Sequence, residues 1–267
     1  MESVIKKNNI KIIGNSEEVI IFAHGYGCDQ SMWRFVTPAF SEKYKIVLID
    51  LVGSGNSDPS YYNFQKYSSL TGYANDIIEI CDSLNLKNVT LVAHSVSCMI
   101  GALACIERPE LFKNLIMVGP SPCYINDGDY PGGFSALELE SLSHSLESNY
   151  LGWSSAITPT IMGNSDKPEL TEELTNSFCR NDPERAIHFA KVTFGGDNRK
   201  DLPLISTPTL VIQCSEDFIA PLAVGKFVHS AIKNSKFTLL KATGHCPHLS
   251  APKETIEAIQ TYLLEQK

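Results

Sequence analysis

The chain has 267 residues, of which 43% are hydrophobic and 19% are charged. This composition supports a large buried core and excludes an intrinsically disordered chain. The formal net charge is −8 and no run of Lys or Arg stands out. We therefore expect no nucleic-acid partner, because phosphate binding needs a concentrated basic face.

The sequence also lacks export and membrane signals. Residues 1–14 mix Lys and Asn with Ile and have no continuous apolar stretch, unlike a signal peptide. No segment approaches the roughly 18 uncharged apolar residues that a membrane-spanning helix needs. Eight cysteines are scattered without a C-x-x-C pair, which favours reduced thiols over a disulfide framework. We therefore expect a cytoplasmic protein without a membrane span.

Short apolar runs alternate with longer helical patterns along the chain. The runs lack apolar/polar alternation, as expected of strands buried on both faces in a parallel sheet. They occupy residues 19–23, 46–50, 89–93, 115–118, 210–214 and 237–240. Apolar residues at helical spacing occupy 73–84, 97–106 and 252–264. This order predicts a mostly parallel, doubly wound α/β sheet, and imperfect alternation over 4–13 predicts an antiparallel edge hairpin.

Residues 123–198 interrupt this rhythm, because no good strand pattern is found there. Helical patterns fill the segment, at 135–150, 153–162, 170–179 and 183–194. We therefore predict two parts, a sheet-containing core made of 1–122 and 199–267 and a helical cap made of 123–198. The cap would be an insertion after one strand of the sheet.

The segment 92–97 (VAHSVS) lies between a predicted strand and a predicted helix. It has the form of the nucleophile elbow G-x-S-x-G, with Ala93 and Ser97 in place of the glycines. The turn is tight enough to need very small flanking residues, and Ala and Ser are the next smallest after Gly. The elbow would lift the Ser95 hydroxyl above the sheet, beside a helix N-terminus that favours developing negative charge. Ser95 is therefore the predicted nucleophile.

A serine hydroxyl needs a base to take its proton. In this architecture the acid and then the histidine follow the serine along the chain. Asp217 follows the apolar run 210–214, and His245 follows the run 237–240. Both would lie at the carboxyl ends of strands near Ser95, which predicts a Ser-His-Asp triad. Glu216 is the rival acid.

A tetrahedral oxyanion needs preorganised N–H donors. We expect one from the backbone of Val96, the residue after the nucleophile, and one from Tyr26 in the glycine-flanked loop 24–27. His94 is interpreted as a structural neighbour within the elbow. His245, Cys246 and His248 suggest metal ligands, but no second ligand pair lies nearby, so we expect no metal and no cofactor.

Several sequence blocks together resemble the α/β-hydrolase superfamily. Within it the chain is similar to the bacterial stress-response regulator RsbQ and to the plant karrikin and strigolactone receptors, over nearly its whole length. The blocks are 24–33 (HGYGCDQSMW), 53–58 (GSGNSD), 94–96 (HSV), 108–112 (RPELF), 119–127 (GPSPCYIND) and 244–248 (GHCPH). Ser97 departs from the Gly that RsbQ-like proteins often carry, and this departure is shared with the receptors.

The resemblance implies an α/β-hydrolase fold with a four-helix cap over a small hydrophobic pocket and the triad at its floor. It implies a small hydrophobic ester or lactone as ligand, and stress signalling with a PP2C-type phosphatase partner. The candidate pocket residues besides Tyr26 are Tyr124, Phe134, Leu142, Trp153, Ile157, Phe189, Phe194, Phe218 and Ile219.

Other functions remain open from the triad alone. One is a metabolic serine esterase or lactonase without a signalling partner, and others are a perhydrolase or a C–C bond hydrolase. A haloalkane dehalogenase is disfavoured, because it needs a carboxylate at position 95. No apolar stripe in the sequence demands a dimer, so we expect a monomer.

Overall fold

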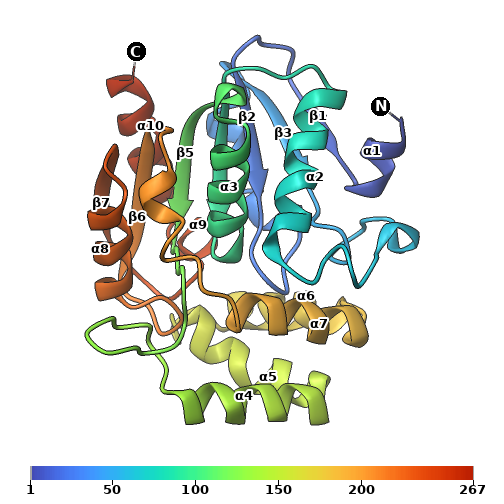
Figure 1. The fold of residues 1–267 in the computed structure, drawn as a ribbon, viewed down its shortest axis with the longest axis vertical. Helices are drawn as coiled ribbons and strands as arrows, with labels where there is room; N and C mark the ends of the chain where they lie inside the picture. The colour runs from blue at the N-terminus through green and yellow to red at the C-terminus, as the bar shows by residue number, and fades with distance from the viewer. Residues whose placement is uncertain (1, 267) are drawn as a thin grey trace.

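A seven-stranded sheet forms the centre of the protein in a computed structural model that describes residues 2–266 (Figure 1). The strand order is β1-β3-β2-β4-β5-β6-β7, and only β1 runs antiparallel to its neighbour. The strands are β1 (Lys11–Ile13), β2 (Val19–Ala23), β3 (Lys45–Ile49), β4 (Val89–His94), β5 (Phe112–Val118), β6 (Thr209–Glu216) and β7 (Ser235–Thr243). All six predicted runs are strands, which confirms the mostly parallel α/β sheet.

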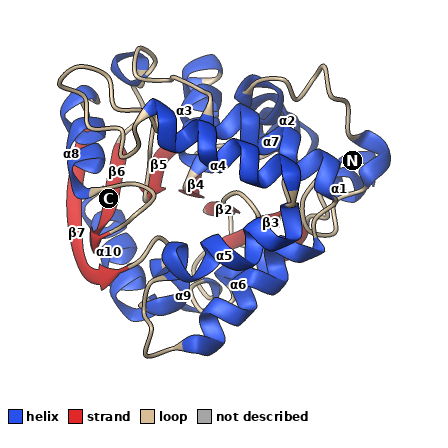
Figure 2. Cartoon of the chain, turned by 90° about the horizontal axis from the view of Figure 1, so that it is seen from below, coloured by secondary structure: helices blue, strands red, loops and turns tan. Residues whose placement is uncertain are grey.

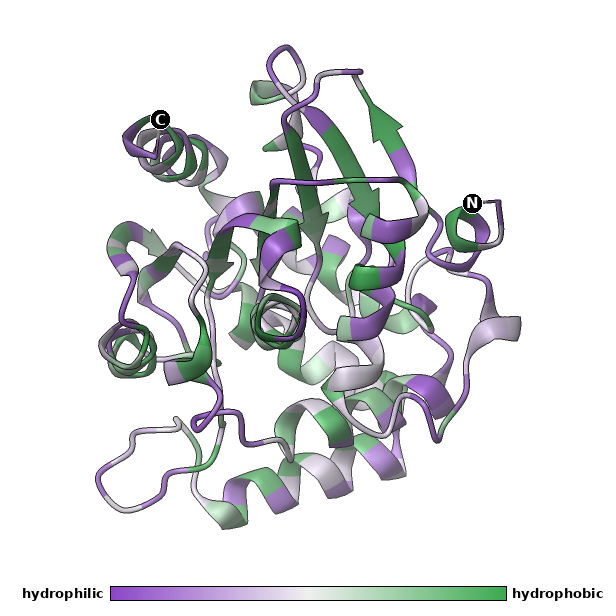
Figure 3. Ribbon diagram, turned by 45° about the horizontal axis from the view of Figure 1, so that its top comes forward, coloured by the Kyte–Doolittle hydropathy of each residue, from purple (hydrophilic) through white to green (hydrophobic). Residues whose placement is uncertain are grey.

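Helices cover both faces of this sheet (Figures 1 and 2). One face packs against α2 (Leu70–Ser83), α3 (Val96–Glu107) and α8 (Leu222–Ala231). The other packs against α10 (Pro252–Glu265), beside the single turn of α9 (Pro247–Ser250). Because successive side chains of a strand point to opposite faces, both must be apolar in a doubly covered sheet. Every residue of β2 and β4 is accordingly buried, and the strands form the hydrophobic centre in Figure 3.

Four helices lie between β5 and β6 in the chain and cover the carboxyl ends of the strands (Figure 2). They are α4 (Ala136–Ser148), α5 (Tyr150–Met162), α6 (Pro168–Arg180) and α7 (Pro183–Phe194). Polar side chains cap three of their N-termini. Ser135 and Glu138 form a capping box, Asn149 accepts from the Gly152 N–H, and Asp182 accepts from the Arg185 N–H.

The predicted hairpin over residues 4–13 is wrong in its first half. Residues 11–13 are an antiparallel edge strand, but they pair with β3, and the preceding residues form helix α1 (Glu2–Lys7). The physical reason lies far away in sequence. The buried Lys7 ammonium is 2.6 Å from the carboxylates of Asp76 and Glu79 on α2, and this interaction holds α1 as a helix against α2.

Two further expectations concern the chain as a whole. Within residues 2–266, no helix is both long and apolar enough to cross a membrane. All eight cysteines lie in that range as free thiols, and seven are buried. They therefore pack as small hydrophobic side chains, as predicted.

The ion pairs around Asp76 yield the first prediction. Asp76 is 2% exposed and binds Lys7, Lys66 and the Tyr67 hydroxyl. Asp76→Ala removes one partner of the buried Lys7 ammonium. The free energy of unfolding, measured in urea, should therefore fall by about 3–5 kcal/mol. The exposed pair Lys236–Glu265 is the control, and Lys236→Ala should lower the free energy of unfolding by less than about 1 kcal/mol. Equal losses in the two variants would contradict a structural role for the buried cluster.

Candidate active site

Strand β4 ends in a sharp turn that projects Ser95 above the sheet edge. Ser95 has φ 56° and ψ −124°, a conformation that residues with a Cβ rarely adopt. Its N–H donates to the Val118 carbonyl of β5 over 2.9 Å, and α3 begins at the next residue, Val96. Ala93 and Ser97 on either side are fully buried, so larger side chains would not fit. This is the geometry of a nucleophile elbow.

Three side chains form a continuous hydrogen-bonded chain at this edge. His245 Nδ1 lies 2.7 Å from Asp217 Oδ2, and His245 Nε2 lies 2.8 Å from Ser95 Oγ. The second Asp217 oxygen accepts from the N–H groups of Ile219 and Ala220, which fixes the carboxylate. All three side chains belong to buried residues. Because the carboxylate accepts at Nδ1, the His245 proton lies there and Nε2 is free to take the Ser95 proton.

The two predicted oxyanion donors flank this serine. The Val96 N–H is the first of α3, and the Tyr26 N–H belongs to the loop after β2. Neither donates a hydrogen bond to any residue in the described part of the chain. Gly25 lets the loop come close, since a Cβ there would lie 2.6 Å from His94 Nδ1. Both N–H groups are therefore available to an oxyanion.

Side chains next to Ser95 tie the elbow to its surroundings. The Ser97 hydroxyl donates to the carbonyl of His24, at the start of the loop that carries Tyr26. His94 Nε2 lies 2.8 Å from the carbonyl of His245. Ser97 therefore does more than replace a small glycine, because its hydroxyl anchors the loop that supplies a predicted oxyanion donor.

Two adjoining cavities lie between the elbow and the cap. The lower one has a free volume of about 30 Å³ and reaches Ser95 and His245. The upper one, of about 40 Å³, lies among α4, α5 and α7. They share Tyr26, Ile161, Phe194 and Ile219. Each has room for only about two or three water molecules.

Comparison with known proteins agrees with this geometry. A family model described as "Alpha/beta hydrolase family" matches residues 20–258. The chain belongs to the α/β-hydrolase family.

Individual relatives of this hydrolase cover almost its entire length. It is 36% identical over 262 residues to "Strigolactone esterase D14" of Arabidopsis thaliana, covering 98% of each chain. It is 35% identical to "Karrikin insensitive 2 receptor CA" of Petunia hybrida, again over 98% of each chain. A solved structure of a hydrolase from Oleispira antarctica superposes with a TM-score of 0.96 and 40% identity, covering 98% of this chain and 97% of that one.

The predicted pocket residues divide into two groups. Seven of the nine line the cavities: Tyr124 the lower one, Phe194 and Ile219 both, and Phe134, Leu142, Trp153 and Ile157 the upper one. Phe189 and Phe218 line neither cavity. The Phe189 ring packs on Tyr73 with a centroid distance of 4.6 Å, between cap and core. Phe218 is 51% exposed and contacts Phe134 from outside.

The sequence analysis missed part of the lower cavity wall. The missed lining residues are Cys28, His94, Ile161, Leu174, Phe178, Thr193 and Cys246. Leu174 and Phe178 were within reach, since they repeat at four-residue spacing along the predicted helix 170–179, and such a stripe faces a core or a cavity. Cys28 and Cys246 immediately follow predicted functional segments, but a lone thiol in a sequence gives no direction in space.

The hydrogen-bonded chain yields the second prediction. Asp217→Asn should leave the fold intact but lower kcat for an ester by about 10⁴-fold, because the amide cannot hold His245 in the required tautomer. Glu216→Gln is the matched control, since Glu216 lies next to Asp217 but is exposed at the end of β6. Steady-state kinetics on both variants, with circular dichroism to check folding, measure the effect. A larger loss in Glu216→Gln would assign the acid to Glu216.

Proposed function

We propose that this α/β-hydrolase is a serine hydrolase that binds and cleaves a small hydrophobic ester or lactone. The observation that carries the proposal is the hydrogen-bonded series Asp217–His245–Ser95, with distances of 2.7 and 2.8 Å, beside a small cavity. A buried serine paired with an oriented imidazole is the arrangement required for nucleophilic catalysis.

The reaction would run in two steps. His245 Nε2 takes the Ser95 proton while Ser95 Oγ attacks the ester carbonyl, and the N–H groups of Tyr26 and Val96 stabilise the oxyanion. The protonated imidazole then returns its proton to the leaving alcohol, which leaves an acyl group on Ser95. A water molecule, deprotonated by His245, releases the acid and restores the serine.

The cavity walls favour an apolar ligand with few polar atoms. Most of the side chains that line the cavities are aromatic or aliphatic. In such pockets, a few polar groups at defined positions orient the ligand. The Tyr124 hydroxyl lies beside Ser95, and burial raises its pKa, so it stays protonated and can donate a hydrogen bond. At the outer end of the upper cavity, the Glu147 and Lys191 side chains form an ion pair of 3.0 Å between α4 and α7.

We further propose a signalling role in the cytoplasm, in which the ligand-bound cap 123–198 on the core 1–122 and 199–267 controls a PP2C-type phosphatase of the stress response. Similarity to proteins named as receptors supports this role. The 40% identity to a bacterial hydrolase supports the alternative, a metabolic esterase or lactonase. Turnover separates them: many cycles per second on an ester, with no effect on a PP2C-type phosphatase from the same organism, would contradict signalling.

The nucleophile yields the third prediction. Ser95→Ala should lower hydrolysis of p-nitrophenyl butyrate by at least about 10³-fold, because triad members act as a unit. A fluorophosphonate probe should label the wild type at Ser95 and leave the variant unlabelled. Ser230→Ala, at an exposed serine on α8, is the control and should label normally. Labelling of Ser95→Ala at wild-type level would refute the nucleophile.

Two aromatic residues of α7 yield the fourth prediction. Phe194 lines both cavities, whereas Phe189 packs on Tyr73. Phe194→Ala should therefore raise KM for p-nitrophenyl butyrate. It should lower the free energy of unfolding by less than Phe189→Ala does. Phe189→Ala should lower the free energy of unfolding by about 3–5 kcal/mol and leave KM nearly unchanged. The same ratio of KM change to stability loss in both variants would show that Phe194 only packs the cap.

A further inference from the structure

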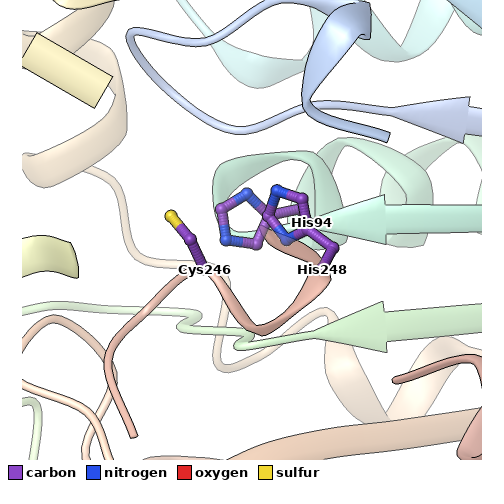
Figure 4. A group of neighbouring side chains, drawn as sticks. All are labelled: His94, Cys246 and His248. Carbon is purple, nitrogen blue, oxygen red and sulfur yellow. The ribbon is translucent and has the colours of Figure 1, made fainter. Parts of the chain in front are cut away.

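A cluster of two histidines and a cysteine lies directly behind the proposed triad. His94 precedes Ser95, Cys246 follows His245, and His248 lies on α9. One donor atom from each lies within 4.8 Å of the others, and all three residues are at most 2% exposed. Figure 4 shows the two imidazole rings against each other, with a centroid distance of 4.4 Å, and the Cys246 side chain beside them.

The nitrogen atoms of this cluster lack the partners that buried polar atoms normally have. Both ring nitrogens of His248, and Nδ1 of His94, make no hydrogen bond within residues 2–266. His94 Nε2 lies 2.8 Å from the His245 carbonyl, so it carries the proton and leaves the Nδ1 lone pair unused. Unpartnered buried polar atoms are rare and destabilise a fold by about 1–3 kcal/mol each.

Aromatic rings enclose both imidazoles. His248 packs between the rings of Trp33, at 4.6 Å, and His94, at 4.4 Å. The His245 ring lies 4.9 Å from His94. Packing therefore holds the two rings side by side, and their unpartnered nitrogen atoms take no part in positioning them.

We propose that His94, Cys246 and His248 form a binding site for a thiophilic transition-metal ion of the Zn²⁺ class. Two imidazoles and one thiolate are a donor set that such ions prefer over Mg²⁺ or Ca²⁺. Binding of the ion releases the proton of the Cys246 thiol, because thiolate is the form that binds metal. The ion enters through the lower cavity, because His94 and Cys246 both line it. A ligand or water from that cavity completes the coordination.

This site would be linked to the catalytic residues by the chain itself. Zinc–nitrogen bonds of about 2.0 Å and zinc–sulfur bonds of about 2.3 Å place the donor atoms roughly 3.5 Å apart. Binding therefore draws together donors that now lie within 4.8 Å. Cys246 is bonded to His245, so this movement acts on the backbone segment that also carries the proposed catalytic imidazole.

The sequence analysis considered His245, Cys246 and His248 and expected no metal, because no second ligand pair lies near them in the sequence. The third ligand, His94, comes from β4 and meets them only because the ends of β4 and β7 lie at the same sheet edge.

The test titrates Co²⁺, a coloured substitute for Zn²⁺, into tag-free, reduced protein. We expect one Co²⁺ per chain, with d–d bands of low-coordinate cobalt and a near-ultraviolet thiolate-to-cobalt charge-transfer band. Added Zn²⁺ should displace the Co²⁺ and abolish both the d–d bands and the charge-transfer band. The charge-transfer band should vanish in Cys246→Val and persist in Cys105→Val, which replaces a buried thiol of α3 outside the cluster. Ser95→Ala should retain both bands, so metal binding is measured independently of hydrolysis.

A histidine variant and folding controls complete the experiment. His248→Leu keeps an apolar side chain between Trp33 and His94 and should lose the d–d bands while its circular dichroism stays that of the wild type. If the wild type shows no charge-transfer band, or if the band survives in Cys246→Val, the proposal is wrong and the imidazoles only pack. If either variant unfolds, zinc analysis of dialysed wild-type protein decides, with less than stoichiometric zinc counting against the site.

Discussion

The backbone turn at Ser95 is the constraint on which the rest of the site depends. A positive φ at a residue with a Cβ costs about 1–3 kcal/mol and persists only where the surrounding structure over-determines it. Here β4 is paired on both sides, with β2 and β5, and every one of its residues is buried. The strand cannot relax without breaking the middle of the sheet, so the strained turn is held in place.

That turn also fixes two loops that are distant in sequence. His94 is hydrogen-bonded to the carbonyl of His245, and Ser95 is hydrogen-bonded to the His245 ring. The Ser97 hydroxyl donates to the carbonyl of His24. The proposed nucleophile, base and oxyanion loop are therefore tied together by three residues of the segment 94–97. These shared hydrogen bonds restrict the relative movement of the three groups, and catalysis depends on such orientation.

Tyr26 extends the same coupling into the cap. Its hydroxyl donates to the Ala186 carbonyl on α7 over 3.0 Å, and its ring contacts Trp153, Phe178 and Phe194 edge-on. Its backbone N–H is the proposed oxyanion donor. Any displacement of α5, α6 or α7 would therefore act on the loop that carries the proposed oxyanion donor.

The sequence predicted those features that depend on local periodicity and on parallel topology. Apolar runs located six strands because both faces of a parallel sheet must be apolar. Parallel strands end at one edge, which brings Ser95, Asp217 and His245 together in the expected order. The sequence failed where distant side chains decide the outcome. Helix α1 forms because Lys7 pairs with Asp76 on α2. Phe189 lines neither cavity because it packs on Tyr73, and Phe218 lines neither because half of its side chain is exposed to solvent.

The buried carboxylate of Asp76 and the polar atoms of the lower cavity differ in how their hydrogen bonds are satisfied. Asp76, deep beside α1, has every oxygen bound by Lys or Tyr groups, as a stable interior requires. The lower cavity differs, because His94, Tyr124 and Thr193 each present a buried polar atom without a partner within residues 2–266. Such atoms weaken the fold by about 1–3 kcal/mol each unless a bound group satisfies them. In this cavity, which reaches Ser95, a bound ligand or water can supply the missing hydrogen bonds.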